Sequence, residues 1–177
     1  MTERDPEATR SHTIGIWPLV HAERAALAAD LADLTGEQVA MRLAEQLGAT
    51  PAETIDRFRS VLTSTTKPPV PTVAMLGETI VHAQDIRLPL GIRHDYPIGT
   101  LTRLAEYYQG SDLPVLTRTR IKGLRLVATD GPFTTGSGPL VSGTTLALIM
   151  AMAGRGAYCD ELQGDGAATL RERSQTS

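Results

Sequence analysis

The sequence predicts a mainly α-helical fold, on the strength of three observations. Hydrophobic residues make up 41% of the chain but aromatic residues only 4%, so aliphatic side chains must fill the core, and this composition favours helices. Hydrophobic residues recur near a period of 3.6 between Ile14 and Leu34. Helix start and stop signals flank several later segments. The 177 residues suit one domain, or one domain with a small appendage.

Five helices are expected before residue 112. The sequence Thr50-Pro51-Ala52-Glu53 is a helix start, with a capping threonine, a proline at the first helical position and a glutamate three residues after the threonine. A later helix is expected to stop before Pro89 and Gly91, which commonly end helices. The predicted helices span 13–34, 37–47, 51–64, 72–88 and 98–109.

The C-terminal third has a different pattern. Hydrophobic and polar residues alternate from Ile121 to Thr129, which predicts a strand with Leu124, Leu126 and Ala128 on one face. Turn sequences follow it, and Val141 is expected on a short returning strand of a β-hairpin near 120–142. A buried helix is predicted at 146–152. We therefore divide the chain into a disordered tail (1–12), a helical bundle domain (13–112) and a small α+β segment (118–173) packed on the bundle.

Charge and cysteine content exclude several classes of function. A formal net charge of -3 gives no reason to expect nucleic acid or an anionic membrane as a partner. The longest apolar run, Leu146 to Ala153, is too short for a bilayer, which needs about 20 residues. The N-terminus lacks the apolar stretch of a signal peptide, and the one cysteine, Cys159, cannot form an internal disulfide. We expect a cytoplasmic protein in which Cys159 is a packed residue.

The candidate functional residues lie on the predicted helix at 72–88. Glu78 and His82 are four residues apart, so both side chains lie on one helix face, where a carboxylate and an imidazole can bind one metal ion. Asp85 lies three residues further on, placed to orient the imidazole from the second shell. The alternative is an ordinary solvated pair of side chains. Apolar neighbours such as Met75 and Ile80 indicate that this polar stripe is partly buried.

A catalytic zinc ion usually has about three protein ligands, so a third residue is needed. His21, on the first predicted helix, is the one plausible candidate; the alternative for it is a structural or surface role. His12 in the tail and His94 in a loop beside Asp95 are expected to be solvated.

The segment Gly77-Glu78-x-x-Val81-His82-x-x-Asp85-Ile86-Arg87-x-Pro89-Leu90-Gly91-Ile92 resembles the second metal motif of the mycothiol-dependent maleylpyruvate isomerase family, which has a DinB-like four-helix bundle. The resemblance extends over nearly the whole chain. The other matching segments are Leu31-x-x-Leu34-Thr35, residues 50–69, Gly123-Leu124-Arg125-Leu126-x-Ala128-Thr129-Asp130, Gly136-Ser137-Gly138-Pro139, Gly154-Arg155 and Leu162-x-Gly164-Asp165-Gly166.

The resemblance implies that Glu78 and His82 are ligands of a divalent, zinc-like metal in a helical bundle. It also implies that the thiol cofactor mycothiol binds the open metal position while a small-molecule substrate is isomerised or transferred. One feature departs from the family. Its members carry a loop with Trp and Cys after the first helix, and then a helix that supplies a histidine ligand, whereas this chain has no histidine between His21 and His82. This pattern resembles an internal deletion.

Two functional hypotheses remain open at the level of sequence. The first is a metal- and thiol-dependent isomerase or transferase whose metal site is incomplete. The second is a catalytically degenerate bundle that acts as a binding or oligomeric module. Loss of a bundle helix would uncover an apolar stripe, and stable monomers rarely expose large apolar patches, so we expect a homodimer.

Overall fold

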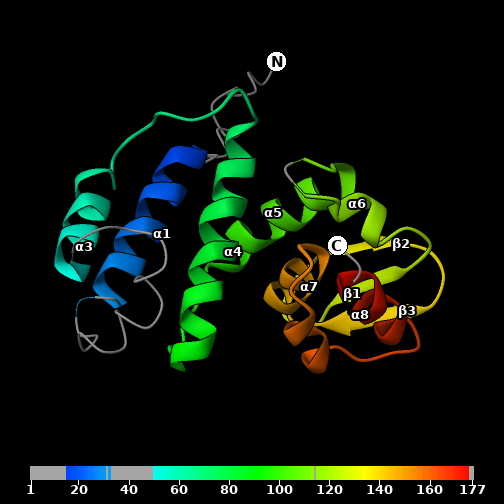
Figure 1. Cartoon of the computed structure of the whole chain (residues 1–177). Coiled ribbons are helices and arrows are strands. Elements are labelled where there is room, and N and C mark those ends of the chain that lie inside the picture. Colours follow the sequence, from blue (N-terminus) through cyan, green and yellow to red (C-terminus); the bar gives the residue numbers. More distant parts are fainter. Residues whose placement is uncertain (1–14, 31, 33–49, 114, 176–177) are drawn as a thin grey trace, which may run out of the picture.

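A computed structural model describes residues 15–30, 32, 50–113 and 115–175 of the chain. Within these residues the fold is mainly helical, with one small sheet towards the C-terminus (Figure 1), as the sequence predicts. The predicted helix at 37–47 and the tail at 1–12 lie outside the described residues. The helices are α1 (Ile16–Asp30), α3 (Pro51–Ser60), α4 (Thr72–Leu90), α5 (Ile98–Gly110), α6 (Thr117–Arg120), α7 (Thr145–Met152), the 3₁₀ helix η1 (Gly156–Glu161) and α8 (Ala167–Gln175).

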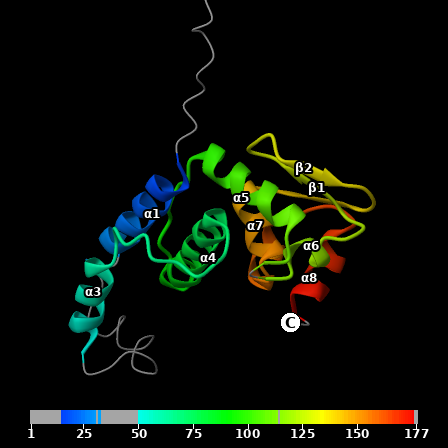
Figure 2. The ribbon, with the colours of Figure 1, turned by 90° about the horizontal axis from the view of Figure 1, so that it is seen from above.

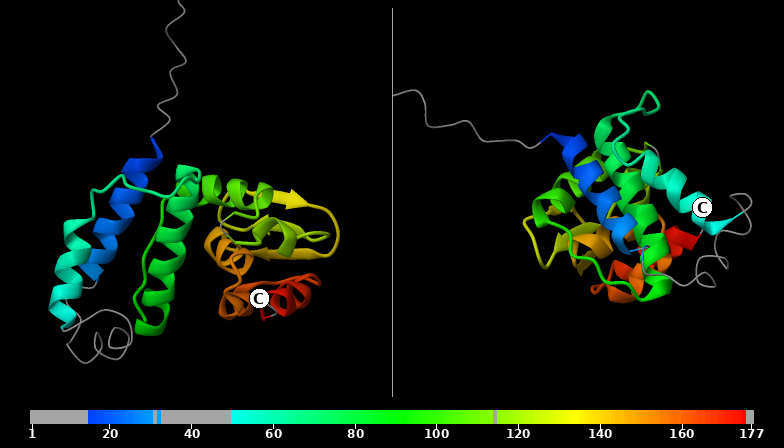
Figure 3. Two further views of the ribbon diagram at one scale, coloured as in Figure 1. Left: turned by 45° about the horizontal axis from the view of Figure 1, so that its top comes forward. Right: turned by 90° about the vertical axis from the view of Figure 1, so that its left-hand side faces the viewer.

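The helices α3, α1 and α4 lie side by side at one end of the molecule, and the sheet lies with α7 and α8 at the other end (Figures 1 and 2). Helix α5 connects the two ends, since it packs against both α4 and α7 (Figure 3). The buried hydrophobic residues form one continuous cluster, from Val20 on α1 to Leu170 on α8. The C-terminal segment therefore shares its core with the helices.

The N-terminus of α3 forms as the capping sequence predicts. The side chain of Thr50 accepts a hydrogen bond from the backbone N–H of Glu53 at 3.3 Å, with Pro51 at the first helical position. The helix ends at Ser60 rather than at the predicted residue 64, and turns over residues 61–63 lead into the extended segment before Pro71. Helix α1 covers Ile16–Asp30, and the predicted ends of this helix at residues 13 and 34 lie outside the described residues.

The end of α4 corrects the prediction that the helix stops before Pro89. Pro89 lies inside the last turn of α4, where a missing backbone N–H removes a single hydrogen bond. Gly91 then closes the helix in the left-handed conformation, with φ of 67°, and its N–H bonds the carbonyls of Arg87 and Leu88. Pro89 is tolerated because the hydrogen bonds that close the helix are donated by Gly91, which follows it.

The sheet has three strands in the order β2-β1-β3, formed by β1 (Arg125–Ala128), β2 (Thr134–Gly136) and β3 (Leu140–Gly143). Leu124, Leu126 and Ala128, which were predicted to share one face, are all buried. The strand is shorter than predicted, however, because residues 121–123 form a turn and β1 begins only at Arg125.

The predicted hairpin partner was wrong. The strand that pairs antiparallel with β1 is β2, whereas β3, which contains Val141, pairs with β1 in the parallel direction. Between β2 and β3 the chain crosses the start of β1 to reach the opposite edge of that strand. A Cβ atom on Gly136 would collide there with the carbonyl oxygen of Leu124, and one on Gly138 with that of Gly123. The two glycines therefore permit the close crossing.

Helix α7 is the centre of the core. Residues 147–152 have no exposed surface, which agrees with the predicted buried helix at 146–152. Hydrophobic residues lie on all sides of α7, because neighbouring elements (α5, η1 and the sheet) cover it on several sides. Cys159 is buried beside α8, and burial raises the pKa of its thiol, as expected for a packed residue. Within the described chain, no helix combines the length and apolar character that a membrane span needs.

Candidate functional site

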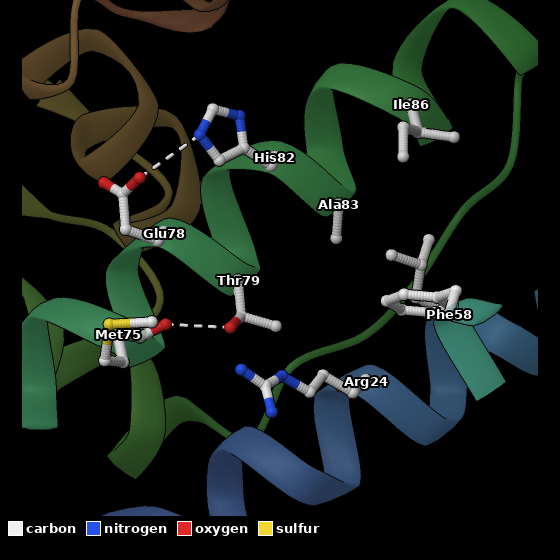
Figure 4. Close-up of a pocket in the computed structure, with 9 residues that line it drawn as sticks. Arg24, Phe58, Met75, Glu78, Thr79, His82, Ala83 and Ile86 are labelled. Carbon is white, nitrogen blue, oxygen red and sulfur yellow. Dashed lines mark hydrogen bonds and ion pairs between the residues drawn. The ribbon is translucent and has the colours of Figure 1, made fainter. Parts of the chain in front are cut away.

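Glu78, His82 and Asp85 lie in succession along one face of α4, as their spacing predicts. The His82 Nε2 atom is 3.3 Å from Glu78 Oε2 (Figure 4), and His82 Nδ1 is 3.2 Å from Asp85 Oδ2. The imidazole is thus held between two carboxylates that both come from its own helix. These contacts follow from local geometry, because residues three and four apart on a helix are neighbours.

An arginine from the C-terminal segment completes the arrangement. Arg155 follows α7 and binds Asp85 through two parallel contacts, Nε to Oδ1 at 3.1 Å and Nη2 to Oδ2 at 2.7 Å. A third donor of Arg155 is bonded to the carbonyl of Ala153, so the guanidinium is anchored to the C-terminal end of α7. Hydrogen bonding to Asp85 raises the pKa of Arg155. Arg155 belongs to the matching segment Gly154-Arg155, but nothing in the sequence connects it with Asp85, which is 70 residues away.

The polar stripe is more exposed than the sequence suggested. The side chains of Glu78, His82 and Asp85 are 38%, 61% and 37% exposed. Of their apolar neighbours, Ile80 and Leu76 are fully buried in the core, whereas Met75 lines a cavity together with Glu78 and His82. A side chain that follows an apolar residue in sequence need not share its environment on a helix.

The predicted third ligand is not brought to this pair. Among the described residues no group of three or more His, Cys, Asp or Glu side chains is arranged to hold a metal ion. His21 instead lies beside Trp17, with ring centroids 5.6 Å apart, and its Nε2 atom is buried without a hydrogen-bond partner. The expectation that His94 is solvated was wrong, because His94 is half-buried with Nε2 3.2 Å from Glu23. His12 lies outside the described residues.

A buried polar cluster that the sequence did not predict connects α1 and α4. Arg87 on α4 has no exposed surface and donates to Glu23, to Asp30 at 2.7 Å and to the hydroxyl of Tyr96 at 2.8 Å. Burial by itself would lower the pKa of Arg87. The hydrogen bond to Glu23 and the negative charge of Glu23 together have the larger effect, so the pKa of Arg87 is raised. The Glu23 partner is 64 residues away, and the sequence contains no local signal for such a pair.

The same cluster extends to the C-terminal segment. Gln84 donates to the hydroxyl of Tyr96 at 2.7 Å and accepts from the hydroxyl of Tyr158 on η1 at 2.9 Å. Burial raises the pKa of both tyrosines to about 12, so both hydroxyls stay protonated. The hydroxyl of Tyr158 donates to Gln84, whereas that of Tyr96 accepts from Gln84 and Arg87. The cluster therefore fixes α4, which carries Glu78 and His82, against α1 on one side and η1 on the other.

A cavity of about 290 Å³ opens beside Glu78 and His82, between α1, α3 and α4 (Figure 4). Helix α1 contributes Arg24 and Leu27 to its wall, and α3 contributes Phe58. The remaining lining residues lie on α4 and are Met75, Glu78, Thr79, His82, Ala83 and Ile86. The Glu78–His82 pair is thus at the edge of a space that could receive a small molecule.

The turn of α4 that carries Glu78 depends on a glycine. A Cβ atom on Gly77 would collide with the hydroxyl of Tyr108, a fully buried residue of α5. Burial raises the pKa of Tyr108, and the charge of Glu78 raises it further. Gly77 therefore allows α5 to approach α4 directly beneath the candidate site.

Comparison of the chain with protein-family models, with curated proteins and with solved structures finds no match.

Proposed function

We propose that the protein is a divalent-metal- and thiol-dependent isomerase or transferase of the mycothiol-dependent maleylpyruvate isomerase family, with a DinB-like bundle and an incomplete metal site. Glu78 and His82 are the protein ligands in this proposal, and a thiol such as mycothiol supplies a further ligand. The proposal is supported most by the position of the His82 ring, which is fixed on one side by Asp85 and presents its other nitrogen to Glu78.

The distance between the two proposed ligand atoms fits a metal ion. Zinc binds nitrogen and carboxylate oxygen at about 2.0–2.2 Å in tetrahedral geometry, which separates two ligand atoms by about 3.3–3.5 Å. The Oε2 atom of Glu78 and the Nε2 atom of His82 are 3.3 Å apart. The separation of these two atoms therefore matches that of two ligands of one zinc ion.

Asp85 and Arg155 support this pair. A carboxylate that accepts the Nδ1–H of a histidine leaves Nε2 deprotonated and able to bind a metal. Asp85 is placed to do so, and the two contacts from Arg155 hold its carboxylate in position. A bound divalent ion would lower the pKa of a coordinating thiol and so supply a nucleophilic thiolate near neutral pH. The protein itself binds, orients and partly shields the reacting groups.

The degenerate binding module remains the second candidate, and two observations favour it. The part of the chain that the structure describes offers no third metal ligand, and His82 is 61% exposed. Two ligands leave the remaining positions to water, and four-ligand sites reach their apparent binding energy of about 10–16 kcal/mol only with a complete shell. In this candidate His82 forms only hydrogen bonds with Glu78 and Asp85 on the surface of α4.

Elemental analysis of protein purified without chelator separates the candidates. We expect zinc to bind weakly and to be lost on dialysis, and we expect His82→Ala to lower the apparent affinity for added zinc by at least tenfold. The matched control is His12→Ala, which lies outside the motif. Equal zinc affinity of wild type and His82→Ala would refute the metal proposal. Stoichiometric metal that survives dialysis and is lost in both His82→Ala and His21→Ala would show that His21 completes the site.

A further inference from the structure

The cavity beside Glu78 and His82 contains one cationic side chain. Arg24 is half-buried, and its guanidinium reaches from α1 towards Thr79 and Met75 of α4 (Figure 4). Within the described residues its hydrogen-bond partner is the carbonyl of Ser64, at 3.0 Å from Nη1. That partner is neutral and uses one of five N–H donors, so a ligand with a negative charge would be stabilised here.

The rest of the wall is mainly apolar, with Glu78 and His82 at the edge of the cavity. Leu27 and Ala83 are buried, and Phe58 and Ile86 face the same space from α3 and α4 (Figure 4). The one hydroxyl in the wall, that of Thr79, already donates to the carbonyl of Met75 at 2.8 Å. Such a surface binds an apolar body and offers little to a ligand that carries many hydroxyl groups.

The volume limits the size of the ligand. A cavity of about 290 Å³ is at the lower end of the usual range for small-molecule sites, about 300–1,000 Å³. At about 30 Å³ for each water-sized group, it holds about ten non-hydrogen atoms.

We propose that this cavity binds a small amphipathic carboxylate, with the carboxylate on Arg24 and an apolar chain of medium length against Leu27, Phe58 and Ile86. The inference rests on the proposed function in so far as Glu78 and His82, at the edge of the cavity, would act on this ligand. Binding itself requires no metal, because Arg24 and the apolar wall supply the contacts. The ligand class can therefore be tested separately from the metal.

The test is a two-dimensional ¹H–¹⁵N NMR titration of the whole chain in excess EDTA, with octanoate as the probe and 1-octanol as its uncharged counterpart. Octanoate is expected to shift amide signals of α1, α3 and α4, and to bind about ten- to a hundredfold more tightly than 1-octanol, the factor that one charge-assisted contact supplies. Arg24→Gln is expected to abolish this preference while leaving 1-octanol binding unchanged. The matched control is Arg57→Gln, an exposed arginine of α3 outside the cavity wall.

A second pair of variants tests the apolar end of the cavity. Ile86 and Leu88 are 37% and 47% exposed, so a glutamate at either position should leave the fold intact. Ile86→Glu is expected to weaken octanoate binding at least tenfold, whereas Leu88→Glu, outside the cavity wall, should not. Equal binding of octanoate and 1-octanol to wild type would overturn the proposal, as would a preference that survives Arg24→Gln. Shifts confined to other elements would also overturn it. Each result is independent of whether the protein binds zinc.

Discussion

Replacing Arg87 by methionine should destabilise the protein strongly. Arg87 is fully buried, and the side chain of Glu23, to which it donates, is 7% exposed. The substitution leaves the Glu23 carboxylate buried without its cation, and breaking a buried ion pair in this way costs about 3–5 kcal/mol. Asp30 adds less to the cost because its side chain is 24% exposed and can be solvated.

The measurement is urea unfolding followed by circular dichroism. For a denaturant slope of about 2 kcal/mol/M, the expected loss shifts the midpoint by about 2 M. A domain of this size is typically stable by about 5–15 kcal/mol, so the variant should still fold. The control Arg57→Met, at an exposed position of α3, should change stability by less than about 0.5 kcal/mol.

The double variant tests the cause of the loss. If the cost is the uncompensated charge on Glu23, then adding Glu23→Gln to Arg87→Met should restore part of the stability. A loss below about 1 kcal/mol in Arg87→Met would refute the reasoning. A double variant less stable than Arg87→Met would show that lost packing, and not buried charge, dominates.

Three further predictions follow from the structure. Gly77→Ala should lower the free energy of unfolding by about 1–3 kcal/mol, because the new Cβ atom collides with the hydroxyl of Tyr108. Adding Tyr108→Phe should restore part of this loss, and equal losses in the single and double variants, measured by thermal unfolding, would contradict the prediction. Burial acts to raise the pKa of Asp112, but hydrogen bonds from the backbone and hydroxyl of Thr119 outweigh it, so the pKa is lowered. The stability that Asp112 contributes is therefore present above its ordinary pKa of 3.8 and is lost as the pH falls from there through the lowered value. Asp112→Ala should cost about 1 kcal/mol at neutral pH and progressively less as the pH falls below 3.8, and a cost independent of pH in urea titrations would refute this. The expected homodimer is tested by light scattering, and a monomer at micromolar concentration would refute it.

The features that the sequence by itself determined are local ones. The start of α3 depends on Thr50 and Pro51, which are adjacent in the chain. The approach of His82 to Glu78 and Asp85 follows from the repeat of one helix. Alternation along a strand likewise determines which residues of β1 are buried. In each case the interacting groups are within four residues of one another, so their spacing alone specifies the contact.

The tertiary structure decided what depends on groups far apart in the chain. It paired Arg155 with Asp85 and Arg87 with Glu23 across 70 and 64 residues. It placed β3 parallel to β1, a choice that turn residues cannot specify, because the crossing at Gly138 requires the backbone of β1 to be already in place. Packing also decided that α4 is covered by α1 and α5 and leaves His82 exposed, since burial depends on which neighbouring helices cover each face and not on the order of residues along one helix.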